Sequence, residues 1–387
     1  MQWDRIETGA LATVPMSPSD LDRFRLRHGD LLVCEGGEVG RAALWDSSLK
    51  ECYYQKALHR LRPTRGFVPR LMLAFLRYWA DRGTLADYVT QTSIAHLPKE
   101  KFSVIPLPVP KPEEQRAIAA ALSDVDSLIS GLNRLAAKKR NIKQAAMQQL
   151  LTGNRRLPGF GREISRVKQA VVDAAPGHSR HRSTEWKQST IGALIRGDGG
   201  SVQTGPFGTL LKASEYATPG LPLISVGEIG PGVLRIGEKT PRVPRSVVQR
   251  LPEYVLRDGD IVFGRKGAVD RSALVRGDRA FLGSDALRLR LPRSCHPPFV
   301  ACQLQTHSVR TWLLQNAIGT TMASLNQEIL QRVSLLMPPT VPEQIAIAAI
   351  ISDMDAEIAA LERRRDKTRL LKQGMMQELL TGRIRLL

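Results

Sequence analysis

Polar and basic side chains flank two glycine-containing loops in the second half of the chain, at residues 205–208 and 264–267. Arg and Lys can donate hydrogen bonds to guanine edges or to phosphates, and Gln can bind adenine. A further polar cluster near Gly319 suits phosphate contact. The candidate nucleic-acid contacts here are Gln203, Thr204, Phe207, Lys212, Arg265, Lys266, Arg271, Thr320, Thr321 and Asn326. For each of them, solvated surface or loop structure is the alternative role.

The first half of the chain offers a smaller set of candidates of the same kind. They are Arg41, Tyr53, Tyr54, Gln55 and Ser93. The formal net charge of +19 and the pI of about 10.3 support this interpretation, because a strongly basic surface binds the phosphates of nucleic acids well. A membrane partner is not expected, since no apolar run is long enough to span a bilayer and residues 1–4 are no secretory start.

Motifs for catalysis are weak in this sequence. Residues 296–299, His-Pro-Pro-Phe, resemble the Asn/Asp-Pro-Pro-Tyr/Phe box of adenine methyltransferases, but histidine cannot reproduce the hydrogen bonds of the leading amide or carboxylate. We interpret the motif as a proline-stiffened loop. Residues 197–200 are not a P-loop, because no Gly-Lys-Ser/Thr follows. The four scattered cysteines lack metal-ligand spacing and predict reduced thiols in a cytoplasmic protein. We expect no cofactor, no metal and no catalytic residue.

An internal repeat predicts the helices that would position these loops. The segment 114–153 returns 229 positions later as residues 343–382, without a gap. Apolar residues in both copies alternate at spacings of three and four, which is typical of a coiled-coil seam. The predicted seam residues are Ile118, Leu122, Val125, Ile129, Leu132, Leu135, Ile142 and Leu150, and then Ile347, Ile351, Met354, Ile358, Leu361, Leu371, Met375 and Leu379.

Each repeat therefore predicts one long helix. We expect it to run from a Ser-Asp pair (123–124; 352–353) to a Thr-Gly pair, with Pro112 and Pro342 just upstream and Gly153 and Gly382 ending it. Such a helix is roughly 45–50 Å long. Its middle turns basic, at residues 138–140 and 363–365. A solvated face and a strip facing a polyanion are both open interpretations.

A weaker relationship joins the two non-helical regions. Residues 26–32 match 256–262, and 37–41 align with 267–271, each giving a Gly-Asp turn, an apolar strand, a glycine loop and another strand. The basic Pro- and Gly-containing stretch 158–185 reads as a linker. Met1 aligns near Gly230, so about 45 residues after Trp186 have no counterpart at the start. We expect a first domain whose front is missing or whose start is placed too late.

The order of parts carries a resemblance to a known family. A variable domain is followed by a Pro-Glu-Glu-Gln helix start, a Leu-Leu-Thr-Gly helix end, a Pro-Gly-Phe link, a second variable domain and the same helix again. This resembles the specificity (S) subunit of type I restriction–modification systems. The resemblance implies a non-catalytic subunit that reads a bipartite double-stranded DNA target, docks two methyltransferase (M) subunits and joins restriction (R) subunits through the complex.

The fold class expected is α+β, with two mixed α/β target-recognition domains joined by two long helices in an antiparallel coiled coil with an internal pseudo-two-fold. The expected boundaries are 1–111 for the first target-recognition domain, 112–157 for the first helix, 158–185 for the linker, 186–341 for the second domain and 342–387 for the second helix. The alternatives are an orphan or defective specificity subunit reading one half-site, a DNA methyltransferase, and a scaffold without a DNA role.

Overall fold

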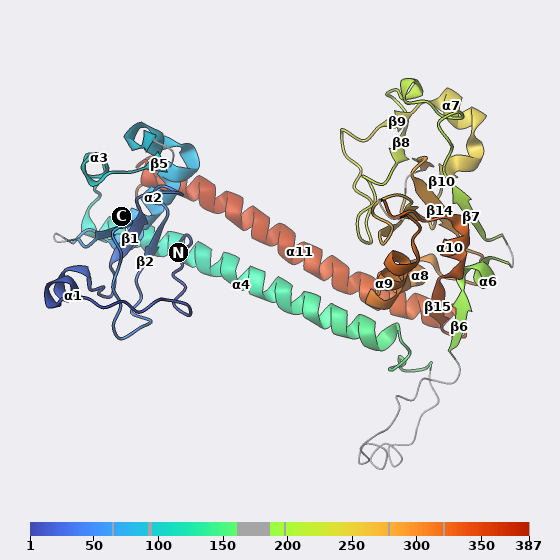
Figure 1. Cartoon of the computed structure of the whole chain (residues 1–387), viewed down its shortest axis with the longest axis horizontal. Coiled ribbons are helices and arrows are strands. Elements are labelled where there is room, and N and C mark those ends of the chain that lie inside the picture. Colours follow the sequence, from blue (N-terminus) through green and yellow to red (C-terminus); the bar gives the residue numbers. More distant parts are fainter. Residues whose placement is uncertain are drawn as a thin grey trace, which may run out of the picture. The chain divides into compact units, whose positions relative to one another are not determined.

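The computed structural model describes residues 1–63, 66–91, 95–160, 186–196, 199–277, 279–319 and 322–386. The chain divides into two compact units, each a mixture of helices and strands (Figure 1). Unit 1 is Met1–Ala136 with Ala360–Leu387, and unit 2 is Ala137–Ala359. The predicted linker falls almost entirely on residues 161–185, outside the described ranges. Both long helices are shared between the units, because each unit packs on the start of one helix and the end of the other.

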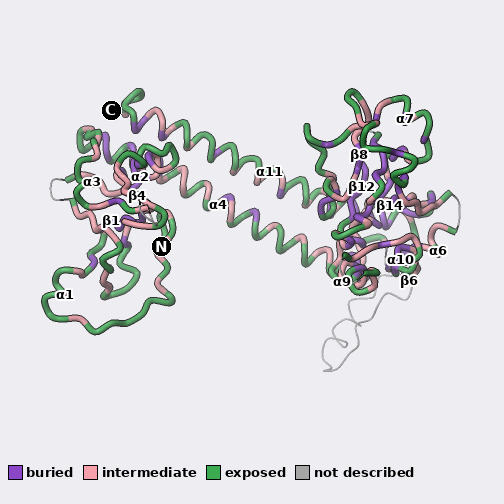
Figure 2. Tube along the Cα trace, turned by 45° about the horizontal axis from the view of Figure 1, so that its top comes forward, coloured by how far each residue is buried: buried purple, intermediate pink, exposed green. Residues whose placement is uncertain are grey.

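Unit 1 is built on a small antiparallel sheet with strand order β2-β1-β3. Its elements are α1 (Pro18–Phe24), β1 (Leu31–Cys34), β2 (Ala42–Leu44), β3 (Leu58–Leu61), α2 (Pro69–Arg82), the 3-10 helix η1 (Thr84–Tyr88), β4 (Thr90–Gln91), β5 (Ala95–His96), α3 (Lys99–Ser103) and the start of α4 (Pro112–Leu150). Helix α2 packs Leu71, Phe75 and Leu76 into one core with β1 and the first turns of α4. Helix α1 has no buried residue and lies exposed at the surface (Figure 2).

Unit 2 contains two four-stranded sheets and more helices than unit 1 among the residues described. Its elements are β6 (Lys187–Thr190), α6 (Ile191–Ile195), β7 (Ser201–Thr204), η2 (Ala213–Glu215), β8 (Leu221–Ile224), β9 (Arg242–Val243), α7 (Arg245–Arg250), η3 (Pro252–Tyr254), β10 (Val255–Leu256), β11 (Ile261–Gly264), β12 (Ser272–Leu274), β13 (Ala280–Leu282), β14 (Ala286–Arg290), α8 (Pro297–Leu304), α9 (His307–Asn316), α10 (Gln327–Arg332), β15 (Ser334–Met337) and the start of α11 (Val341–Leu380). The strand orders are β12-β11-β14-β7, β10-β13-β8-β9 and β15-β6. The main core lies between the first of these sheets, α8 and α11.

The two units share a framework of hydrogen bonds. Asp30 and Asp260 each accept a hydrogen bond from the backbone amide three residues earlier, at 2.7 and 2.8 Å, in the turn that leads into a buried strand. Strand β1 pairs with β2 and β3 as β11 pairs with β12 and β14. These pairings confirm the predicted correspondence between residues 26–41 and 256–271.

Helices α4 and α11 begin at Pro112 and Val341, eleven residues before the Ser-Asp pairs at 123–124 and 352–353. Pro112 and Pro342 lie inside the first turn rather than upstream of the helices, because the first amides of a helix have no intrahelical acceptor and proline loses no bond there. At about 1.5 Å per residue each helix is roughly 58–60 Å long. Gly153 and Gly382 follow the helix ends with φ of 68° and 72°, as expected for left-handed terminators.

Ion pairs show that the helices run antiparallel within each unit. In unit 1, Arg385 reaches Glu114 at the start of α4, and Lys372 reaches Asp126 further along. In unit 2, residues 229 positions away repeat this arrangement, as Arg156 pairs with Glu343 and Lys143 with Asp355. Lys139 of the predicted basic middle also pairs with Glu357, and Arg365 with Asp366.

Most predicted seam residues are buried or half-buried, but three are not. Leu135, Ile142 and Leu371 are exposed, so these three positions do not belong to the contact between the helices. A straight helix of 3.6 residues per turn drifts about 20° per heptad away from a strict seven-residue repeat. Positions selected by a strict three-four alternation therefore rotate out of the contact in the second half of each helix.

No helix among the described residues is long and apolar enough to cross a bilayer. Cys34, Cys52, Cys295 and Cys302 are free thiols, as predicted.

Candidate nucleic-acid interface

Two of the predicted loops meet on the surface of unit 2. The guanidinium of Arg265 lies 5.6 Å from the ring centroid of Phe207, so the loop at 264–267 stacks on the loop at 205–208. Arg265 also donates from Nη1 to the carbonyl of Ser284 at 3.2 Å. Gly205 lets the 205–208 loop pass close to the backbone of Gly283, since a Cβ at position 205 would lie 1.8 Å from the Gly283 carbonyl oxygen. The guanidinium is thus oriented by a ring and a carbonyl, and its other donors are available to a ligand.

The polar segment before α10 attaches to the same loops. Gly267 donates its amide to the carbonyl of Ala323 at 2.9 Å, Leu325 donates to the carbonyl of Arg265 at 2.8 Å, and Lys266 pairs with Ser324 in a short bridge. Lys266 itself is exposed. The structure therefore brings three predicted segments together, although Thr320 and Thr321 lie outside the described residues.

The remaining predicted residues of unit 2 have varied surroundings. The Asn326 side chain accepts from the amide of Ile329 at 2.7 Å and caps α10, which occupies its carbonyl oxygen. The side-chain amide of Gln327 contacts the Thr204 hydroxyl at 2.9 Å, and Gln203 lies beside Thr204 on β7. Lys212, directly before η2, and Arg271, directly before β12, are both exposed.

Among the residues that the structure describes, the predicted residues of unit 1 lie in separate surroundings. Arg41 pairs with Glu38 at 2.6 Å in the turn before β2. The Tyr53 hydroxyl donates to the carboxylate of Glu51, and this hydrogen bond raises the pKa of Tyr53. Tyr54 is half-buried, Gln55 is exposed, and Ser93 lies outside the described residues.

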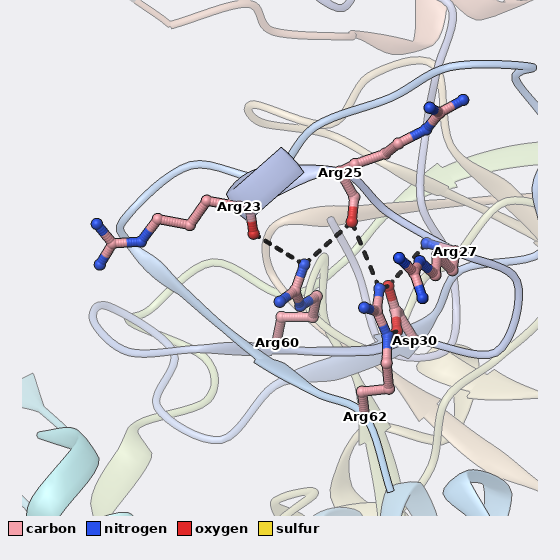
Figure 3. Close-up of polar contacts among 6 residues, drawn as sticks. All are labelled: Arg23, Arg25, Arg27, Asp30, Arg60 and Arg62. Atoms are coloured by element: carbon pink, nitrogen blue, oxygen red, sulfur yellow. Dashed lines mark hydrogen bonds and ion pairs between the residues drawn. The ribbon is translucent and has the colours of Figure 1, made fainter. Parts of the chain in front are cut away.

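An arginine cluster that the sequence analysis missed lies around Asp30 in unit 1 (Figure 3). Arg62 binds the buried Asp30 carboxylate through Nε and Nη2, both at 2.6 Å. Arg60 donates from Nη1 to the carbonyls of Arg23 and Arg25, both at 3.0 Å, and its guanidinium lies 5.0 Å from the Tyr54 ring centroid. The signal in the sequence was the local density of arginine at positions 23, 25 and 27, at the end of α1 and directly after it.

The His-Pro-Pro-Phe motif is the start of a helix, not the loop that we predicted. His296 is the N-cap residue of α8, and Pro297 and Pro298 occupy its first turn, where proline costs no hydrogen bond. The amide of His296 donates to Oε1 of Gln344 at 2.7 Å, and Phe299 is fully buried. Burial lowers the pKa of His296. The motif is therefore explained by packing of α8 on α11, and the described residues contain no group of three or more potential metal ligands.

Comparisons with known proteins agree with this architecture. The family "type I restriction modification DNA specificity domain" matches residues 14–143 and 207–370. The MjaVIII type I restriction enzyme specificity subunit of Methanocaldococcus jannaschii is 24% identical over 301 residues, covering 76% of this chain and 65% of that protein. The putative MjaX specificity subunit of the same organism is 22% identical over 381 residues, covering 95% of this chain and 81% of that protein. The chain thus spans slightly less than two thirds of the first relative.

Two solved structures show a similar fold. The S subunit of a type I restriction–modification system from M. genitalium superposes with a TM-score of 0.57 at 15% identity, covering 93% of this chain and 84% of that one. A chain from a study of complex assembly and conformational transition of the type I R-M system gives 0.50 at 19% identity, covering 92% and 82%. These likenesses show the two-domain fold.

Proposed function

Because the chain belongs to the type I restriction–modification DNA specificity family, we propose that it selects the DNA sequence on which a type I restriction–modification complex acts. It reads a bipartite duplex target, one part with each unit, and it docks methyltransferase subunits. Restriction subunits join through that complex. The relatives are specificity subunits, and the chain contributes recognition rather than catalysis.

The observation that carries this proposal is the duplication of one framework in two units. Each unit has the same Asp-anchored turn, the same pairing of three strands and the same ion pairs to the helices. The loops on that framework differ, since residues 34–36 are Cys-Glu-Gly and the equivalent residues 264–266 are Gly-Arg-Lys. A constant scaffold with different loops suits two readers of different sequences.

In unit 2 the reading surface is the meeting point of the two glycine loops and the segment before α10. Arg265 is its most specific candidate, because its guanidinium is held over Phe207 and can present a bidentate donor pair to a guanine. Lys266 is exposed beside it and suits a phosphate. Gln203, Thr204, Lys212, Arg271 and the three polar residues at 320, 321 and 326 remain candidates around this centre.

In unit 1 the loop at 34–37 has no described counterpart of the 205–208 loop beside it. Its candidates, Arg41, Tyr53, Tyr54, Gln55 and Ser93, do not form a comparable cluster. An orphan subunit that reads only one half-site is the second candidate function.

Exposed apolar residues at equivalent helix positions favour docking of like subunits. Ile142 on α4 and Leu371 on α11 lie 229 positions apart, and both are exposed where the seam would have buried them. Exposed apolar residues repeated on related surfaces suit two copies of one partner. We assign these positions to the methyltransferase contacts.

Binding measurements on single variants test the proposal. With the complex reconstituted from M subunits, Arg265→Gln should weaken cognate binding by ~1–3 kcal/mol and relax one base position, whereas Lys266→Gln should weaken all duplexes alike. Arg245→Gln, an exposed arginine on α7, is the control of equal charge. The chain alone should transfer no methyl group from labelled S-adenosylmethionine. Equal effects of the three variants, or reproducible methyl transfer, would contradict the proposal.

A further inference from the structure

One face of unit 1 differs in charge from its counterpart in unit 2. Matching hydrogen bonds identify which residues of the two faces are equivalent. Arg60 and Arg288 donate from Nη1 to the carbonyls of Arg23 and Glu253, at 3.0 and 2.8 Å. In the same way, Arg62 binds Asp30 as Arg290 binds Asp260, through Nε and Nη2 at 2.6–2.7 Å.

Around this conserved anchor, unit 1 has gained positive charge. Four positions keep their residue type, and three change: Arg23 replaces Glu253, Arg25 replaces Val255 and His28 replaces Asp258. Unit 1 thus has five arginines, a histidine and an aspartate where unit 2 has three arginines, two aspartates, a glutamate and a valine. For these seven positions the formal charge with neutral histidine is +4 in unit 1 and zero in unit 2. When Asp22 and Glu51, which lie close to Tyr53, and their equivalents Pro252 and Arg279 are included, the charges are +2 and +1.

The equivalent residues of the two faces differ in how far they are buried. Val255 is 2% exposed and Phe281 is fully buried where they pair between β10 and β13, and both belong to one core cluster with residues of β8 and β9 in the same sheet. The equivalent pair in unit 1 is Arg25 with Tyr53, and Arg25 is exposed. Buried apolar residues have thus been exchanged for an arginine and a tyrosine, which meet water or a polar ligand instead of a core.

Hydrogen bonds fix the backbone that carries the exposed arginines of this face. Arg60 and Arg62 are held by carbonyls and by Asp30, and they fix the backbone of residues 23–27, while the guanidinium groups of Arg23 and Arg25 point away from Asp30 (Figure 3). Arg27 is exposed as well. We call Arg23, Arg25 and Arg27 the arginine face. Glu51 is near this face but is bound by the Tyr53 hydroxyl.

We propose that the arginine face binds the phosphate backbone of duplex DNA and adds affinity to the complex without reading bases. This rests on the proposed function and gives unit 1 a contact that unit 2 does not have. Arg23, Arg25 and Arg27 are exposed, and an exposed guanidinium group can neutralise one phosphate and release its counterion. Phosphate contacts fix position on the duplex and carry no sequence information directly.

The test is the salt dependence of DNA binding by the full chain in complex with its M subunits. The variant is Arg23→Gln/Arg25→Gln/Arg27→Gln, which leaves the backbone carbonyls that anchor Arg60 and Arg62 in place. The matched control is Lys99→Gln/Lys101→Gln/Arg116→Gln, which removes the same charge from exposed positions elsewhere in unit 1. Binding is measured by fluorescence anisotropy on a cognate and a scrambled duplex from 50 to 300 mM KCl, with circular dichroism as the check of folding.

We expect the variant to lower the slope of log K against log salt by about 2–3, and to weaken cognate and scrambled duplexes by the same factor. The control should keep nearly the wild-type slope. An unchanged slope in the variant, an equal loss in the control, or a loss restricted to the cognate duplex would overturn this inference and leave the proposed function standing. Absence of duplex binding by the wild-type complex would overturn both.

Discussion

Replacing Arg156 by methionine should destabilise unit 2 strongly, because it leaves a buried carboxylate without its partner. Arg156 binds Glu343 through Nε at 2.9 Å and Nη2 at 2.7 Å. Trp186 donates to the same carboxylate from Nε1 at 3.3 Å and packs against Gly153, with 3.1 Å from its Cδ2 to a Cβ built there. The side chains of Arg156 and Glu343 are 12% and 0% exposed.

The expected magnitude follows from that burial. Breaking a buried ion pair by removing one partner costs about 3–5 kcal/mol. For a domain of 150–250 residues about 1 kcal/mol shifts Tm by ~2–4 °C, so the melting of unit 2 should fall by roughly 6–20 °C. The equivalent pair in unit 1, Arg385 with Glu114, gives the control. Arg385 is 55% exposed, so water can replace it and Arg385→Met should have a smaller effect on unit 1.

Hydrogen exchange followed by mass spectrometry at increasing temperature separates the units, since a single melting curve would mix them. Peptides from β11 and β14 report unit 2, and peptides from β1 and α2 report unit 1. The double variant Arg156→Met/Glu343→Gln should recover much of the lost stability, because it removes the unpaired charge. A loss below about 1 kcal/mol, or equal losses from Arg156→Met and Arg385→Met, would refute this reasoning about burial.

Three further predictions concern the helices and the titrating groups. The double variant Leu132→Asp/Leu361→Asp should lose folding of unit 1 or assembly with M subunits, by circular dichroism and gel filtration, because Leu132 is buried and would become an unpaired charge; normal assembly would contradict this. Arg385 lowers the pKa of Glu114 below its ordinary 4.5, so this carboxylate's stabilisation is full above that value and is lost as pH falls through the lowered pKa. Glu114→Gln should therefore flatten the acid limb of the stability profile, and an unchanged limb would count against the pair. Burial raises the pKa of Cys302 to about 11, so alkylation at pH 8 should be slower than for a free thiol and should accelerate towards pH 11.

Features encoded by local patterns were predictable from the sequence. The long helices follow from the spacing of their apolar residues, and the turn before each first strand follows from Gly-Asp and a run of apolar residues. The predicted helix starts, at the Ser-Asp pairs 123–124 and 352–353, lie too far along the chain, since the helices already begin at Pro112 and Val341 because the first turn accepts proline. The loop predicted at residues 296–299 failed for the same reason.

Features that depend on distant partners were not predictable. The arginine cluster exists because Arg60 and Arg62 reach carbonyls and a carboxylate more than thirty residues earlier, and strand pairing decides that approach. The stacking of Arg265 on Phe207 likewise joins residues 58 positions apart. Asn326 was predicted as a possible phosphate ligand, and its capping of α10 became visible only with the helix in place.

Selection from random duplexes tests the central claim most directly. The complex reconstituted from this chain and M subunits is used to capture duplexes, and the bound pool is sequenced. A specificity subunit with two readers predicts two blocks of defined sequence separated by a spacer of fixed length. Arg265→Gln should relax one position in the block read by unit 2. A single continuous block, or a pool without sequence preference, would contradict the account.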